Sequence, residues 1–597
     1  MVGPAVDCLL NPLGAVRLSF EKVASASDGF DPASLSNKDW GAKDVFQKFL
    51  FDEGGLSQVP FLDIENQRWI RPNSLVRFRG MVQDMLGNEF YIGAFKDGST
   101  WKTNKFADVS SIDMGPRPEM QIWERSLFYC VPVPGQNSWS VQSYPSSSLI
   151  HRYHAMSSSQ HGEKRSRGSI VDDVESNGSN SELGGTSSCF KKQREEDLPS
   201  QALQASHCSQ GHDADISMVS NFNKKSLSCL VKIYDSMESE LKLNDVVEFI
   251  GVFTFDPELV VHKTNSDTLM DDLCEDPLAH LPPSKVPRLH CLIHRKLDIQ
   301  DFLVGLHIPE PKPSLIRGIR ETLLRHLTSV LGNDGVAAQC ILLHLLSTVH
   351  ARVDSVAVGK LSLNLCGLSA ETVPIFIGHL NLVVQSILPF SQCIPLTVEY
   401  LNTTTLAPRK DYQSNRLITG PLQLVRGTHL TFDETRLISG TLNSVGVANV
   451  RLLKNLMECQ QVEYEFDYYK MEMPADVQLL ILSEGKSNIL PADLLLPFRP
   501  VGITSVTTPT EEDLHAWRWY LASLRSYSHA IEPEMQKVIE DDMVAARQGD
   551  RTLGAADFSR WLTMGRLMSA SFGEANLSLE HWQMVKELER LKNERFK

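Results

Sequence analysis

Two adjacent carboxylates, Asp433 and Glu434, directly follow a strand-like run from His429 to Phe432. In phosphate-binding α/β proteins, acidic residues at the end of such a strand hold Mg²⁺ and polarise a water molecule. This pair is the residue set in the chain best suited to metal-assisted phosphoryl chemistry. We interpret it as the remnant of a magnesium site.

The phosphate-binding loop that this chemistry requires is missing. Upstream, the apolar run 361–366 leads into Gly367-Leu368-Ser369-Ala370-Glu371, where Gly-x-x-x-x-Gly-Lys-Ser/Thr would be needed. The segment has one glycine and no lysine to reach the β and γ phosphates, and Glu371 would repel them. We therefore expect no ATP hydrolysis and no cofactor. The alternative is an ATP-dependent enzyme with an atypical site built on Asp433 and Glu434.

Alternating strand-like and helix-like segments must position these residues. Strands are expected at 361–366, 394–400, 421–425, 429–433 and 477–483, with helices near 370–388 and 447–458. Two apolar helical stripes come before them, and about four helices follow. This alternation predicts a layered core with a largely parallel sheet. We expect a degenerate AAA+-like α/β core over 314–503 and a helical lid over 504–597, whose last helix has Ser578 as N-cap.

The first half of the chain predicts a different architecture. Residues 1–72 form a helical lead-in, and bent strands follow at 75–85, 89–95, 127–133, 229–234 and 243–253, with a turn at Gly87-Asn88. They predict an OB-like β-barrel in two parts, 73–134 and 225–256. Arg77, Phe78, Arg79 and Trp101 could then bind a single nucleic-acid strand. The favoured alternative has Phe78 pointing inward and the arginines in solvent.

A long polar segment, 135–224, separates the two barrel parts. It is rich in Ser, Asn, Gln and Gly and poor in aliphatic residues, which predicts a disordered insertion. A Pro-rich, acidic linker is expected over 257–313. The insertion carries two basic clusters that could act as a nuclear import signal. They are Lys164, Arg165 and Arg167, and Lys191, Lys192 and Arg194.

Composition narrows the function classes. The 597 residues carry a net charge of −15, so direct nucleic-acid binding is not expected. The 11 cysteines include no Cys-x-x-Cys pair, which favours a reducing compartment. No metal is expected, because neither of two His/Cys groups has a second ligand pair at zinc-site spacing. These groups are His207, Cys208 and His212, and His290, Cys291 and His294. No apolar run is long enough to predict a membrane span.

Three separated motifs point to one family. Residues 75–85 (LVRFRGMVQDM), 245–251 (DVVEFIG) and 361–365 (LSLNL) resemble, in order and spacing, the minichromosome maintenance complex-binding protein family in its plant form. The resemblance covers nearly the whole chain. It implies a nuclear, non-enzymatic partner of the replicative helicase subunits, associated with chromatin indirectly. It also implies roles in helicase release during DNA replication and in sister chromatid cohesion.

Within that resemblance, the core looks like a decayed copy of the helicase motor. Residues 420–425 resemble the segment that leads a helicase chain into its Asp-Glu strand, but 478–485 lacks the sensor asparagine at the strand end. Phe498 and Arg499 are what is left of the arginine finger, and 552–555 lacks the lid arginine. The combined losses predict a binding factor and not an ATPase.

Overall fold

The computed structural model describes residues 7–26, 38–108, 119–141, 227–234, 241–255, 278, 281–303, 312–368, 372–502 and 508–596. The two basic clusters, the group at His207, Cys208 and His212, and Glu371 lie outside these residues, so the expectations placed on them stay predictions. In the described part of the chain, no helix has the length and apolar character needed to cross a membrane.

Short helices precede the first sheet. They are α1 (Pro12–Ala26), α2 (Ala42–Gln47), η2 (Lys48–Asp52) and η3 (Gly55–Gln58). Phe46 and Leu50 are buried, whereas Val45 is 42% exposed. The helical lead-in therefore packs on the neighbouring sheet through Phe46 and Leu50, in a cluster that includes Leu75 and Tyr91 of that sheet.

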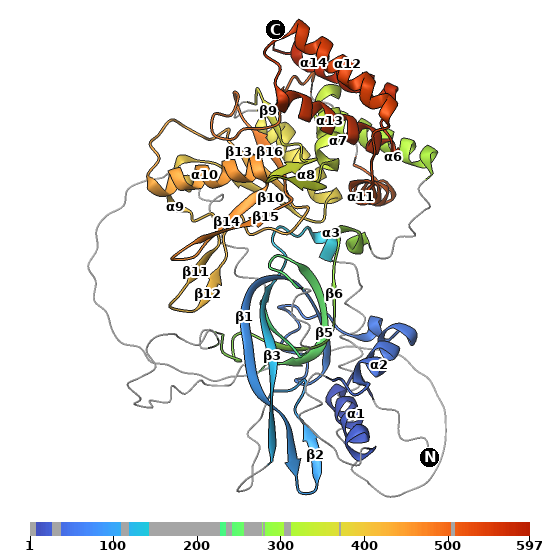
Figure 1. The fold of residues 1–597 in the computed structure, drawn as a ribbon, viewed down its shortest axis with the longest axis vertical. Helices are drawn as coiled ribbons and strands as arrows, with labels where there is room; N and C mark the ends of the chain where they lie inside the picture. Colours follow the sequence, from blue (N-terminus) through green and yellow to red (C-terminus); the bar gives the residue numbers. More distant parts are fainter. Residues whose placement is uncertain are drawn as a thin grey trace, which may run out of the picture. The chain divides into compact units, whose positions relative to one another are not determined.

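The first sheet has six strands, paired in the order β2-β1-β3-β4-β6-β5. The strands are β1 (Leu75–Asp97), β2 (Thr100–Thr103), β3 (Met120–Val131), β4 (Cys229–Ile233), β5 (Val246–Thr254) and β6 (Arg288–Lys296). Because β5 also pairs with β1, the hydrogen-bonded pairing runs round a ring of five strands, β1-β3-β4-β6-β5 and back to β1. Figure 1 shows these strands coiling around a shared interior.

Two sequence predictions for this half are wrong. Gly87 and Asn88 do not form a turn; they lie inside the continuous strand β1, where Gly87 has φ +84° beside a register shift. A glycine at positive φ in a paired strand is typical of a β-bulge. The predicted linker 257–313 contains β6 and the 3₁₀ helix η5 (Ile299–Leu303). The Pro-rich, acidic composition of the surrounding residues led to the prediction of a linker, although these two elements contain apolar residues.

The second main sheet is entirely parallel, as the alternating pattern predicts. Its strands are β9 (Leu363–Cys366), β10 (Ser391–Pro395), β13 (His429–Asp433), β16 (Gln478–Leu482) and β17 (Leu494–Pro497), in the order β10-β13-β16-β9-β17. Connecting helices are η6 (Val373–Ile377), α8 (Gly378–Ile387), α9 (Val398–Thr403) and α10 (Ser444–Cys459). The chain is thus a mixed α/β protein with several sheets.

The predicted strand 421–425 does not form. Leu422 and Val425 are buried in a loop, and a side chain on Gly420 would meet the Leu406 carbonyl at 2.3 Å. β10 also ends earlier than expected, because Thr397 caps a new helix by accepting the Tyr400 N–H.

Two small sheets were not predicted. They comprise β12-β11-β14-β15 and the hairpin β7-β8, with strands β7 (Ala351–Val353), β8 (Val356–Val358), β11 (Arg409–Asp411), β12 (Arg416–Ile418), β14 (Gln461–Glu465) and β15 (Lys470–Pro474).

The remaining helices pack with the parallel sheet. They are α6 (Pro313–Val330), α7 (Gly335–Leu346), α11 (Glu511–Arg525), α12 (Pro533–Gly549), α13 (Ala555–Ser571) and α14 (Leu579–Glu594). Residues of all of them except α12 share one large buried cluster with β9, β16 and β17. Ser578 caps α14 by accepting the His581 N–H, as predicted. Figure 1 shows α13 and α14 beside α7.

Buried polar contacts join the strand ring to the α/β core. The Asp84 carboxylate accepts the Leu417 N–H at 2.8 Å, and Gln423 donates to the Gln83 carbonyl at 3.0 Å. The first residues of the predicted insertion also belong to this joint. Helix α3 (Ser138–Val141) places Trp139 under the Arg518 guanidinium, 4.3 Å from the ring centre. The disorder prediction therefore does not hold for residues 135–141.

Candidate functional site

The carboxyl edge of the parallel sheet brings together the residues that the sequence singles out for nucleotide chemistry. Asp433 ends β13 and is followed by Glu434; Ser483 follows the neighbouring β16; Gly367 follows β9 on the other side of β16. In open α/β sheets, ligands bind in the crevice outside these strand ends. This edge is therefore where a nucleotide site would have to lie.

The loop after β9 uses its backbone donors inside the chain. Gly367, at φ +88°, donates its N–H to the Glu484 carbonyl at 2.9 Å, and Leu368 donates to the Ser483 carbonyl at 3.2 Å. The Leu368 side chain is fully buried. A phosphate-binding loop would direct such N–H groups at phosphate oxygens. These two donors are therefore already occupied by the end of the neighbouring strand.

The two carboxylates are likewise held by their own chain. Glu434 is 8% exposed and accepts a hydrogen bond from Ser487 Oγ at 2.8 Å, and burial raises its pKa. Asp433 accepts hydrogen bonds from the N–H and the hydroxyl of Thr435, at 3.0 and 2.6 Å. Mg²⁺ binds ionised carboxylates that it can reach in octahedral geometry. Glu434, which is buried and hydrogen-bonded to Ser487, is therefore poorly placed to bind Mg²⁺.

The polar side chain after β16 is also turned inward. Asn364 of β9 donates to Ser483 Oγ at 2.7 Å, and that hydroxyl donates to the Gly485 carbonyl at 2.6 Å. Both side chains are buried. Among the described residues of this edge, Gly367, Leu368, Asn364, Ser483 and Glu434 thus all form hydrogen bonds within the chain.

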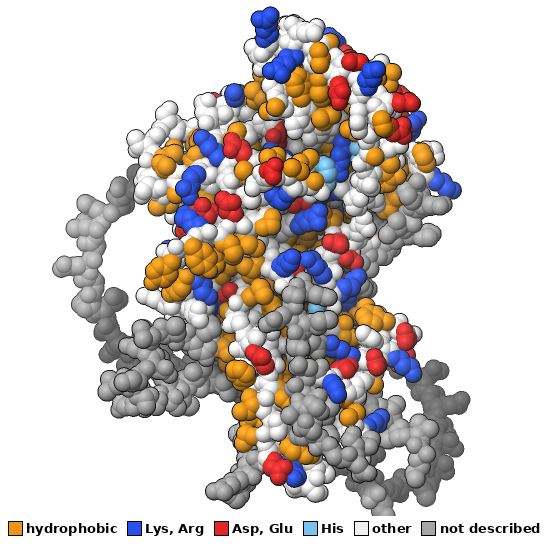
Figure 2. All heavy atoms as spheres, in the orientation of Figure 1, with side chains coloured by type: hydrophobic (Ala, Val, Ile, Leu, Met, Phe, Trp, Pro, Cys, Tyr) orange, Lys and Arg blue, Asp and Glu red, His pale blue; other side chains and the backbone are white. Residues whose placement is uncertain are grey.

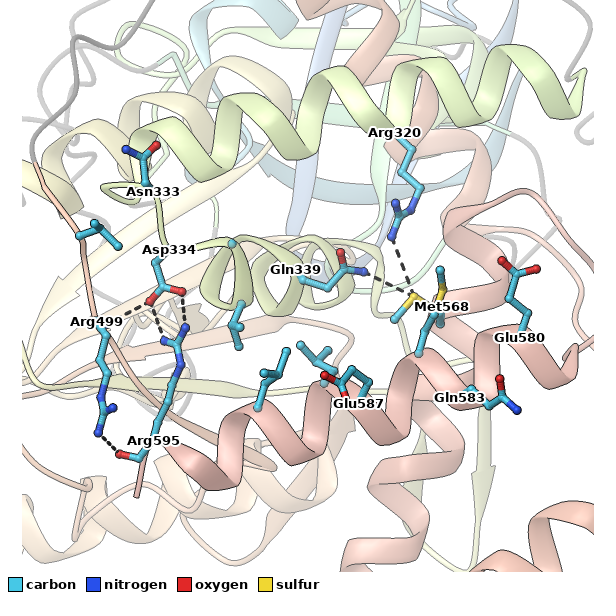
Figure 3. Close-up of a pocket in the computed structure, with 16 residues that line it drawn as sticks. Arg320, Asn333, Asp334, Gln339, Arg499, Met568, Glu580, Gln583, Glu587 and Arg595 are labelled. Carbon is cyan, nitrogen blue, oxygen red and sulfur yellow. Dashed lines mark hydrogen bonds and ion pairs between the residues drawn. The ribbon is translucent and has the colours of Figure 1, made fainter. Parts of the chain in front are cut away.

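A separate groove of about 710 Å³ lies between the start of α7 and the helices α13 and α14 (Figure 3). Its apolar lining includes Val336, Met568, Met584, Leu588 and Leu591. The volume is in the range of ligand and peptide sites. Sequence reasoning missed this groove because its walls come from segments more than 200 residues apart.

A buried ion pair closes one end of the groove. Arg595 binds the Asp334 carboxylate through both terminal nitrogens, each at 2.6 Å, and also donates to the Pro497 carbonyl at 2.9 Å. The Asp334 side chain has no exposed surface. Arg499, which stands where helicases have their arginine finger, donates its backbone N–H to Asp334 and a guanidinium N–H to the Arg595 carbonyl. Arg499 therefore supports this pair within the chain (Figure 3).

The residues considered for nucleic-acid binding are largely buried in the strand ring. Phe78 is 2% exposed, as the favoured alternative holds. The arginines, however, are not in solvent, so that part of the prediction is wrong. Arg77 is 1% exposed and pairs with Glu248 at 2.6 Å, and Arg79 lies 3.5 Å from the same carboxylate. Trp101 is partly buried against the cluster at Phe20 and Trp123. The buried Glu248 explains why both arginines can be buried. The sequence alone did not reveal this pairing, because Glu248 lies about 170 residues away.

Of the three residues His290, Cys291 and His294 on β6, Cys291 Sγ lies 4.0 Å from His294 Nδ1, whereas His290 has other partners. His290 is fully buried between the Tyr234 hydroxyl at 2.5 Å and Asp108 at 3.3 Å. Burial lowers its pKa although Asp108 opposes that effect. This histidine thus belongs to a hydrogen-bonded network of the strand ring.

On the face seen in Figure 2, acidic and basic side chains are interspersed over the described surface.

Comparison with known proteins decides the family. The family model described as mini-chromosome maintenance replisome factor matches residues 46–596. The chain belongs to this family. The resemblance that the sequence motifs indicated is therefore confirmed over almost the full length.

Curated members of the family align with the chain from end to end. A mini-chromosome maintenance complex-binding protein of Arabidopsis thaliana is 55% identical over all of both chains. The proteins of the same name from Danio rerio and Homo sapiens are 33% and 32% identical, over 98% and 99% of this chain and 97% of their own length. The higher identity to the Arabidopsis protein agrees with the plant-type resemblance.

Proposed function

We propose that this chain binds the mini-chromosome maintenance complex and acts on it without catalysing a reaction itself. It would promote release or remodelling of this helicase on chromatin during DNA replication and support sister chromatid cohesion. The proposal is supported by full-length similarity to proteins that are named for binding this complex. Chromatin association would be indirect, through the helicase.

The finer fold assignments belong to the same proposal. A parallel sheet with a glycine loop after one strand, Asp-Glu after another and a helical bundle behind it supports a degenerate AAA+-like core with a lid. The five-stranded pairing ring supports an OB-type barrel. A chain that keeps the shape of core and lid could bind the surface through which one helicase subunit contacts the next. The resulting interface would have no ATP bound in it to stabilise it. A stable pair of this kind buries roughly 1,600 Å².

The observation that carries the non-enzymatic proposal is the occupied loop after β9. Because Gly367 and Leu368 donate to the carbonyls of 484 and 483, an incoming phosphate would have to displace two internal hydrogen bonds. No lysine follows to compensate that loss.

The test is binding of the full chain to purified helicase complex with and without ATP. We expect equal affinity in both conditions for a helicase preparation whose own nucleotide sites are inactivated. We also expect no ATP turnover by the chain alone. Turnover that disappears in Asp433→Ala would overturn the non-enzymatic proposal. If the chain binds neither the complex nor any of its separate subunits, the proposal that the helicase is its partner is wrong.

The other two function classes have less support. An ATP-dependent enzyme would need Glu434 free and ionised, but it is buried against Ser487. Single-strand binding through the ring would need Arg77 and Arg79 exposed, but they pair with Glu248.

Nuclear localisation is part of the proposal and rests on the basic clusters. Changing Lys164, Arg165, Arg167, Lys191, Lys192 and Arg194 together to alanine should shift a fluorescently tagged chain from the nucleus to the cytoplasm. An unchanged nuclear signal would show that these clusters are not the import signal.

A further inference from the structure

The groove beside α14 has an apolar lining that suits a bound helix. Met584, Leu588 and Leu591 stand at i, i+4 and i+7 on α14 and line the groove together with Met568 of α13 and Val336 of α7. Recognition of an amphipathic helix uses an apolar groove of this kind, read by side chains at the same spacing. Methionines suit such a floor because their side chains adapt to different partners.

A buried cation lies at the wall of this groove. Arg320 of α6 is 7% exposed and stacks on Phe572, 4.0 Å from the ring centre. Its hydrogen bonds go to neutral groups, Ser571 Oγ at 3.0 Å and Met568 Sδ at 3.9 Å. Within the described residues, no carboxylate lies at ion-pair distance from it.

A buried guanidinium with no carboxylate at ion-pair distance favours an acidic group on a bound partner, even though Glu580 and Glu587 also line the groove. Burying a cation without a counter-ion is costly, and a carboxylate that reaches it recovers part of that cost. The neighbouring Arg317, by contrast, already pairs with Glu574 at 3.2 Å. Arg320 lines the groove, so an acidic group lying in the groove could reach it.

We propose that this groove binds an amphipathic helix of a mini-chromosome maintenance subunit, with an apolar stripe on Met584, Leu588 and Leu591 and an acidic residue paired with Arg320. The inference rests on the proposed function, since it names the contact through which the complex is held. A second copy of this chain and a basic helix are the other possible occupants, and the test separates them.

The experiment measures the affinity of the full chain for the purified complex and for its separate subunits. Met584→Glu places a charge on an exposed part of the groove floor, where the side chain is 37% exposed, and should weaken binding tenfold or more. Leu579→Glu is the matched control, because Leu579 is 51% exposed on the same helix outside the groove lining. Arg320→Gln should weaken binding similarly and reduce its salt dependence.

A photoreactive residue in place of the exposed Gln583 then identifies the occupant. Cross-links to an acidic amphipathic segment of a helicase subunit support the proposal. Cross-links to a basic segment or to a second copy of the chain overturn it, as does a Met584→Glu affinity equal to that of Leu579→Glu. If the unaltered chain does not bind any subunit, the proposed function fails as well. Binding that is intact in Met584→Glu refutes only the groove.

Discussion

Asp433 and Glu434 stand side by side at the end of β13 but meet different surroundings. Asp433 is partly exposed and caps the turn at Thr435, whereas Glu434 points inward to Ser487. The sequence predicted the position of both, because a strand that ends in two acids is a local pattern. It could not predict that Glu434 would be buried, since Ser487 comes 53 residues later.

Replacing Glu434 by glutamine tests this burial. Because burial raises the folded-state pKa, the ionised carboxylate costs stability at pH 7, and stability rises as pH falls through the raised pKa. The neutral Glu434→Gln keeps an acceptor for Ser487. It should be at least as stable as the original chain at pH 7, and the difference should shrink toward pH 4.5. Urea denaturation at several pH values measures this. A strongly destabilised variant at pH 7 would show that the carboxylate is needed in its ionised form.

Removing Arg595 tests the ion pair at the groove end. Arg595→Ala leaves the fully buried Asp334 carboxylate without its counter-ion and should cost about 3 kcal/mol of unfolding free energy. Arg590→Ala is the control, because Arg590 is exposed and pairs only with Glu587 and Glu594 on its own helix. Its loss should leave the free energy of unfolding nearly unchanged, because exposed ion pairs contribute little to stability. Equal losses in chemical denaturation would contradict the assigned role.

At the scale of elements, a pair of histidines connects α7 to β13. His344 Nδ1 donates to the Leu361 carbonyl at 2.7 Å, so its Nε2 accepts a hydrogen bond from His429 Nε2–H, 3.2 Å away. Both rings are buried and must therefore be neutral. Burial lowers the pKa of His344 to about 4 and that of His429 well below its usual value, and nearby Arg525 acts in the same direction.

This pair predicts acid sensitivity. The unfolded histidines bind protons below about pH 6.5, whereas the folded pair stays neutral, so stability is complete above pH 6.5 and falls as pH drops toward 4. Each ring should contribute a loss of about 1 kcal/mol per pH unit. The double variant His344→Asn, His429→Asn should show a shallower fall than the original chain in denaturation curves at pH 7, 6 and 5. Parallel curves would exclude the pair as the cause.

The elements differ in how well sequence predicted them. The interior strands β13 and β16 and helix α10 were anticipated within a few residues, because their apolar periodicity is local. β6 was missed, since its Leu289 and Cys291 are buried only through strands that lie far away in sequence. The apolar run 421–425 predicts a strand but lies in a loop, because burial of a loop selects the same apolar residues.

At the scale of the whole molecule, α3 joins the strand ring to the core. Trp139 stacks under Arg518 and donates to the carbonyls of Gln385 and Leu388 at 3.0 and 3.1 Å. Helix α3 lies at the start of residues 135–224, which their composition alone predicts to be a disordered insertion. The boundary could not be found from sequence, because the partners of Trp139 are about 250 residues away.

Two deletions test that boundary. Replacing 142–226 by a short Gly-Ser linker should leave the melting temperature nearly unchanged, as expected from the polar composition of that segment. Replacing 138–226 removes α3 as well and should lower the melting temperature by several degrees, because the Trp139 contacts are lost. Differential scanning fluorimetry of both variants measures this. A large drop in the first variant would show that 142–226 contributes to folding.

The pairing of Asp334 with Arg595 also has a consequence for biosynthesis. The two residues are 261 positions apart, so a ribosome working at about 5–20 residues per second makes Asp334 roughly 15 to 50 seconds before its partner. Throughout that interval the nascent chain carries an acid at the start of α7 whose buried site is incomplete. A chain that terminates early keeps this defect permanently. The ion pair at the groove end therefore forms only after the last helix of the chain, α14, and the residue that follows it have been made.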